Sequence, residues 1–213
     1  MVSIVNTYLN LSSDTNHRYN SWKHCYSAFG EVKNIKILSL HLGFYLASWG
    51  MYRGSSGLLQ KDYLVHQGAV EILINFVNLR CIPDKEVKFQ DTENILDLIK
   101  KLQDYYKNIT YILDNKTKHI SPTDTLISKI LLGTLGCIPA YDRFFKDGAI
   151  KEGIVASTIN KNSLIALFNF IKENKKELSD IQQQLLSKTN FYYPIMKIVD
   201  MYFWKIGYDL DKK

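Results

Sequence analysis

The chain has 213 residues, of which 46% are hydrophobic and 23% charged, a composition typical of a globular protein and not of a disordered one. Lysine and arginine number 27 against 21 acidic residues, so the formal net charge is +6. Such a surplus favours anionic partners but says nothing about the fold. The length favours one domain over residues 1–213, with a core large enough to need neither disulfides nor a metal.

Several sequence features argue against a membrane or secreted protein. The longest apolar stretch, Ile37–Tyr52, is interrupted by polar residues and glycines and is too short to span a bilayer. Residues 1–12 lack the basic start of a secretory signal. The three cysteines, Cys25, Cys81 and Cys137, are odd in number and far apart, which predicts reduced, buried thiols. We therefore expect a cytoplasmic protein, and its many lysines, asparagines and isoleucines suggest a bacterial source.

The spacing of apolar residues predicts helices throughout the first half of the chain. We expect them at Ser21–Phe29, Lys36–Tyr52, Leu59–Val77 and Asp91–Lys107. In the first of these, Asn20 is expected to cap the helix and Gly30 to end it. Between the second and the third, the glycines and serines of 53–57 predict a turn.

The second half continues in the same way after a polar, loop-like stretch at Asn108–Ile120. A serine cap at Ser121 followed by proline predicts a helix that runs to Gly133. Further helices are expected at Pro139–Lys146, at Ser163–Ser187 and from Pro194 onward. No segment shows a convincing strand pattern. The sequence thus predicts an all-α single globular domain of about eight helices, which could form two lobes with a cleft between them.

Motif searches give no support for a bound metal or nucleotide cofactor. The five histidines form no HExxH pair, and no two cysteines have CxxC spacing. Neither a phosphate-binding P-loop nor a GxGxxG pattern is present. We expect no metal and no cofactor.

The cluster Trp49–Gly57 combines aromatic residues and an arginine with small residues. On an exposed surface, Trp49 or Tyr52 would suit stacking on a nucleobase, and Arg53 would suit a phosphate. The other interpretation is a corner between two helices, in which Trp49 and Tyr52 belong to the core and the glycines only make the turn. The sequence leaves both open.

The segment Ser121–Phe145 carries the most specific pattern. In it a capped apolar helix leads through Gly133-Thr134 and Gly136 to the run Pro-Ala-Tyr-Asp-Arg-Phe-Phe. This segment resembles the catalytic segment of the helix-hairpin-helix DNA glycosylases, in which an apolar helix and a small-residue loop precede an aspartate that heads the next helix. The residues after Ser121 lack the two hairpin glycines of that family, and the lysine nearest to its Schiff-base position is Lys129.

The resemblance implies a nucleic-acid-binding protein that hydrolyses the N-glycosidic bond of a flipped, damaged base. Asp142 would then be the catalytic carboxylate. Residues expected to hold the base or ligand are Trp49, Tyr52, Arg53 and Tyr141, and residues expected to contact phosphates are Lys61, Lys129, Arg143 and Lys146. Without such a function, Asp142 would be a helix cap or a solvated acid that pairs with Arg143 or a nearby lysine.

A second class of function stays open. The chain could be a non-enzymatic helical interaction module that binds a protein partner or forms a homodimer through the Trp49–Gly57 corner. A helical nuclease or toxin using His24, Arg53 or His66 is a third possibility, which no residue spacing supports. An enzyme should show a cleft between Lys36–Val77 and Ser121–Phe145 with Asp142 at its floor, whereas an interaction module should show a flat apolar patch.

Overall fold

The computed structural model describes residues 1–11, 14–53 and 56–212. Ten α-helices and one β-hairpin are formed in this part of the chain. The elements are α1 (Val2–Asn10), α2 (Ser21–Glu31), α3 (Ile35–Ser48), α4 (Gln67–Asn75), α5 (Thr92–Lys107), β1 (Thr110–Leu113), β2 (Lys116–His119), α6 (Asp124–Thr134), α7 (Arg143–Lys151), α8 (Lys161–Glu173), α9 (Lys175–Thr189) and α10 (Ile195–Leu210).

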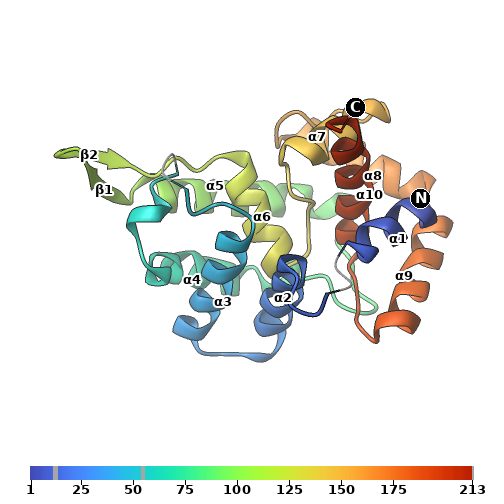
Figure 1. Cartoon of the computed structure of the whole chain (residues 1–213), viewed down its shortest axis with the longest axis horizontal. Coiled ribbons are helices and arrows are strands. Elements are labelled where there is room, and N and C mark those ends of the chain that lie inside the picture. The colour runs from blue at the N-terminus through green and yellow to red at the C-terminus, as the bar shows by residue number, and fades with distance from the viewer. Residues whose placement is uncertain (12–13, 54–55, 213) are drawn as a thin grey trace.

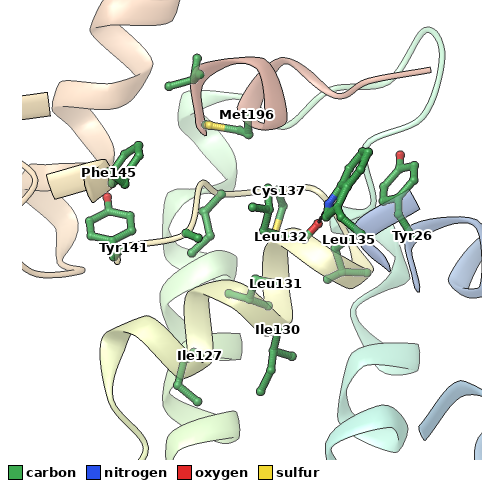
Figure 2. Close-up of a cluster of buried hydrophobic side chains, with 14 of the residues drawn as sticks. Tyr26, Ile127, Ile130, Leu131, Leu132, Leu135, Cys137, Tyr141, Phe145 and Met196 are labelled. Carbon is green, nitrogen blue, oxygen red and sulfur yellow. Dashed lines mark hydrogen bonds between the residues drawn. The ribbon is translucent and has the colours of Figure 1, made fainter. Parts of the chain in front are cut away.

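The two most buried helices, α6 and α10, each have several other helices packed around them. Every residue of α10 from Met196 to Gly207 is buried, and α1, α7 and α9 pack around it. Nearer the middle, α6 packs against α2, α3 and α5, and its apolar side chains meet Met196 of α10 and Tyr26 of α2 (Figure 2). The hairpin projects from one end of the molecule, and both chain ends lie toward the other (Figure 1). The prediction of a single, predominantly helical domain is confirmed.

Two glycines bring α7 and α10 unusually close together. A methyl group on Gly148 would lie 2.0 Å from the carbonyl oxygen of Phe203, and one on Gly207 would lie 1.9 Å from that of Phe144. Only glycine allows backbones to approach so closely. The start of α7, and with it Asp142, is therefore fixed by direct contact with the most buried helix.

Helix boundaries in the first half differ from those predicted. The helix expected over Lys36–Tyr52 ends at Ser48, because Gly50 adopts a left-handed φ of 72° and the Met51 amide donates back to Leu46. The helix expected from Leu59 is regular only over Gln67–Asn75, after 3₁₀ turns. Helix α2 runs through Gly30 to Glu31, and α1 was not predicted.

The second half shows three further differences. Thr123, and not Ser121, caps α6, because its hydroxyl accepts the Leu126 amide. The helix expected from Pro139 begins at Arg143, with Asp142 as its cap. The expected helix Ser163–Ser187 is two helices, which meet at Asn174, where the backbone leaves the helical range with a φ of −104° and a ψ of 18°.

The stretch Asn108–Ile120, expected to be a loop, contains the antiparallel hairpin β1–β2. Its two turn residues, Asp114 and Asn115, both have positive φ angles, as a type I′ turn requires. Asparagine and aspartate tolerate this conformation, so the turn forms without glycine. The Tyr111 side chain of β1 packs against Gly57. This contact places the hairpin beside the segment that follows α3.

All three cysteines are buried and free, as predicted. Within the described part of the chain, no helix has the length and apolar composition needed to cross a membrane.

Candidate functional site

A cavity of about 350 Å³ opens where the end of α3 meets α6 and α7. Its volume lies in the range of small-molecule sites. It is lined by five cationic side chains, one carboxylate and three aromatic rings, together with Met51 and Thr125: Arg18, Arg53, Lys129, Arg143, Lys146; Asp142; Trp49, Phe144, Trp204. The cavity is therefore strongly basic, and six residues proposed from the sequence line it.

Asp142 and Lys129 form the polar centre of this cavity. The Asp142 Oδ1 atom accepts a hydrogen bond from the Phe145 amide at 3.1 Å and so caps α7. Its Oδ2 atom lies 2.9 Å from Lys129 Nζ. The Lys129 side chain is 4% exposed, whereas that of Asp142 is 15% exposed and reaches the cavity. Asp142 thus combines the cap and lysine-pairing roles with access to a concave site.

Trp49 forms one wall of the cavity. One face of its ring stacks on Tyr19, with centroids 5.0 Å apart, and the Lys129 ammonium lies 4.7 Å from the ring centroid. Its Nε1 atom is buried and has no hydrogen-bond partner among the described residues. Tyr19 covers one face of the ring, the Arg18 guanidinium lies 5.5 Å from its centroid and Trp204 meets it edge-on, so only part of Trp49 borders the cavity.

The rim is formed by exposed cations. Arg18 and Arg53 are exposed, and Arg143 pairs with Asp211 at 2.8 Å while remaining 64% exposed. An exposed ion pair of this kind is weak and screened by salt, so a ligand phosphate can replace Asp211. An anion at the mouth of the cavity would therefore meet several arginines and Lys146.

Below the cavity lies a second buried ion pair. Lys197 Nζ and Asp200 Oδ2 are 2.8 Å apart in α10. This pair and the Lys129–Asp142 pair border a small pocket of about 10 Å³, which Trp49 and Trp204 also line. Burial and the charge of Asp200 raise the pKa of Tyr8 and of Tyr45, so both remain neutral phenols beside it.

Three residues proposed for the site are not among the described residues that line this cavity. Tyr52 makes a 2.8 Å hydrogen bond with His66. Tyr141 is buried, and its hydroxyl donates to Ser163. Lys61 is half-buried and follows a 3₁₀ turn. In the predicted turn 53–57, Gly54 and Ser55 lie outside the described residues.

A larger cavity, of about 490 Å³, lies elsewhere, between α8, α9 and the segment before α5. Its lining is mainly apolar and includes Phe89, Phe168 and Leu178, and none of the residues proposed from the sequence is among its described lining. Asp142 is therefore associated with the basic cavity, and not with the largest one described.

Sequence reasoning missed Arg18, Phe144 and Trp204 in the cavity, and Lys197 and Asp200 beneath it. The last two carried a usable signal: they lie three positions apart in the apolar first half of the last helix, where charged residues are expected to be rare. In the described ranges, no three His, Cys, Asp or Glu side chains gather as a metal site would need.

Comparison with known proteins adds no assignment: no family model matches the chain, and no curated protein or solved structure matches it.

Proposed function

We propose that this chain is a nucleic-acid-binding protein related to the DNA glycosylases, which releases a damaged base by hydrolysis of its N-glycosidic bond. The observation that carries the proposal is the Asp142 carboxylate, which lies in a cavity lined by five cationic side chains and three aromatic rings. A nucleotide combines the two features that such a cavity complements, an anionic backbone and an aromatic base.

The charge distribution suits an extruded nucleotide. Phosphates on either side of the base would bind the cations of the rim, principally the exposed Arg53 and Arg143 and the half-buried Lys146. The base would leave the duplex and enter the cavity beside Trp49, and the cost of a few kcal/mol for unstacking would be offset by these contacts. The cavity volume of about 350 Å³ fits a ligand of this size class.

Asp142 would supply the chemistry. As the glycosidic bond breaks, positive charge develops on the sugar, and a fixed carboxylate stabilises that charge and orients the attacking water. The Phe145 amide and the Lys129 ammonium each bind one oxygen of Asp142, which limits the rotation of the carboxylate. Such preorganisation is what electrostatic catalysis requires.

The test is base release by Asp142→Asn on a panel of duplexes that each contain one damaged base. The amide keeps the size of the side chain and removes its charge, so we expect DNA affinity to be retained and base release to fall by about 100-fold or more. Asp147→Asn is the matched control, because Asp147 is exposed on the same helix. Wild-type activity that survives in Asp142→Asn would reject the role of Asp142.

One observation favours the alternative of a partner-binding module. The outer face of α3 exposes three large apolar residues at helical spacing, Ile37, Leu40 and Phe44, which are 45%, 51% and 60% exposed. Clusters of exposed apolar residues often mark interaction sites. This candidate predicts self-association that Phe44→Glu abolishes, as measured by sedimentation; a monomeric wild-type chain would remove the homodimer.

A further inference from the structure

The first two turns of α10 carry a pair of charged residues inside the core. The Lys197 and Asp200 side chains pair at 2.8 Å and are only 4% and 5% exposed. Removing charges from water costs several kcal/mol per ion. The presence of a buried pair is therefore not accounted for by a gain in stability alone. The lysine ammonium lies over aromatic rings, those of Tyr8 at 5.3 Å and Trp22 at 5.2 Å.

Asp200 links this pair to the segment that leads to Asp142. Its Oδ2 atom binds Lys197, and its Oδ1 atom accepts a hydrogen bond from the Ala140 amide at 3.0 Å. Ala140 lies two residues before Asp142, in a stretch between α6 and α7 that is buried and has no regular structure. In such a stretch each backbone amide needs a specific acceptor, and Asp200 provides the one for Ala140.

Helix α6 holds the same segment from the other side. The Thr125 hydroxyl donates to the Tyr141 carbonyl at 2.9 Å, and the Ser128 hydroxyl accepts the Tyr141 amide at 2.8 Å. Lys129 then donates to Asp142 itself. The backbone at 140–142 is thus bound between side chains of α6 and the Asp200 carboxylate of α10, and Figure 2 shows the Tyr141 ring beside Phe145 of α7.

We propose that Asp200 is a positioning residue for Asp142: by fixing the Ala140 amide, it sets the position from which the Asp142 carboxylate reaches Lys129 and the cavity. Lys197 serves this role indirectly, because it satisfies the second oxygen of Asp200 and balances its charge. A displacement of the catalytic group by about 1 Å is enough to cost about 100-fold in rate. The effect on rate rests on the proposed function, whereas the effect on the backbone does not.

The experiment compares two double variants that both lack the buried charges. Lys197→Met with Asp200→Asn keeps an oxygen that can accept the Ala140 amide, whereas Lys197→Met with Asp200→Leu has a side chain of similar size and no acceptor. The two readouts are amide hydrogen exchange at Ala140 and Phe145, and base release from saturating damaged duplex. Exchange at Leu98, in the core of α5, reports whether the fold is intact.

We expect the leucine variant to exchange at Ala140 and Phe145 at least tenfold faster than the asparagine variant, with exchange at Leu98 unchanged. Base release should fall at least tenfold between the two at unchanged DNA affinity, because Asp200 is too deeply buried to contact DNA. If the leucine variant does not fold, Asp200→Ala in the same background replaces it with the same expectation.

Equal exchange at both amides in the two variants would overturn the proposal. Faster exchange with an unchanged rate of base release would also overturn it, because the backbone would then move without consequence for Asp142. If the wild-type chain releases no base, the proposed function fails, and the exchange comparison still decides whether Asp200 holds this segment.

Discussion

The Asp142 carboxylate caps a helix, pairs with a buried lysine and faces a basic cavity. The first two contacts contribute to stability, and the third is open to a ligand. Helix caps contribute about 1 kcal/mol, and breaking a buried pair costs about 3–5 kcal/mol because a charge is left without a partner. Substitutions at Asp142 can therefore separate a loss of stability from a loss of chemistry.

Two substitutions of Asp142 are predicted to differ in stability. Asparagine keeps one oxygen, which can cap α7, but its amide nitrogen is a donor and cannot accept from Lys129, so Asp142→Asn should lower the free energy of unfolding by about 3 kcal/mol or more. Asp142→Ala also removes the cap and should lower it by about 1 kcal/mol further. Denaturant unfolding gives both values. In a Lys129→Met background no buried lysine loses its partner, so Asp142→Asn should cost much less there, and an undiminished cost would contradict this account.

At the scale of elements, the corner after α3 is tied to α5 through a buried histidine. The His66 ring makes hydrogen bonds with the Tyr52 hydroxyl at 2.8 Å and with the Tyr106 hydroxyl at 2.7 Å. Burial lowers the pKa of His66 to about 3. The histidine is therefore neutral in the folded protein at pH values where it takes up a proton in the unfolded chain.

This difference predicts a loss of stability in acid. Above about pH 6.5, His66 is neutral in both states and contributes no pH dependence. Below it, the unfolded chain binds a proton that the folded chain excludes, so the free energy of unfolding should fall by about 1.4 kcal/mol per pH unit until about pH 3. Between pH 6.5 and 4.5, the free energy of unfolding of His66→Gln should fall by about 2 kcal/mol less than that of the wild type. His24→Gln, at an exposed site, should behave as the wild type; an identical acid dependence in His66→Gln would refute this assignment.

At the scale of the whole molecule, the net charge of +6 is concentrated in part around one cavity. The surplus favours anionic partners in general, and Arg53, Arg143 and Lys146 gather at the cavity mouth, where the proposed function places the phosphate backbone. The exposed apolar face of α3 is a separate surface. The salt dependence of DNA binding distinguishes the nucleic-acid-binding proposal from the partner-binding one.

We expect binding to duplex DNA to weaken steeply as salt is added, because each phosphate contact releases a counterion. Arg53→Gln and Lys146→Gln should each reduce the slope of log affinity against log salt by about 0.9. Lys101→Gln is the control, since Lys101 is exposed on α5 and pairs with Asp97. Absence of measurable affinity at low salt would favour the partner-binding module.

The helices could be predicted because their signal is local. Leu38, Leu42 and Tyr45 recur at helical spacing and are buried as that spacing requires. The helix boundaries were harder to predict from the sequence. Ser121 and Thr123 are both residue types that cap helices, and only the three-dimensional structure shows that Thr123 is the cap. The hairpin was missed because its turn uses Asp114 and Asn115 without a glycine.

The candidate site could be predicted in part. Asp142 was predicted from a motif resemblance, and Trp49 and Arg53 from a sequence cluster that combines aromatic residues and an arginine with small residues. The sequence does not show that these residues line the same cavity. Their meeting depends on how α3 and α7 pack against α6 and α10, which is a property of the tertiary structure. The role of Asp200 depends on a contact sixty residues away along the chain.

The burial of the cysteines gives the protein a built-in reporter. Burial raises the pKa of the Cys137 thiol to about 12, so in the closed structure almost no thiolate exists to react with an alkylating reagent. Cys137 lies in the connection between α6 and α7, five residues before Asp142. Its rate of alkylation therefore measures how often this connection opens to solvent, and a bound ligand that holds the connection closed would protect the sulfur.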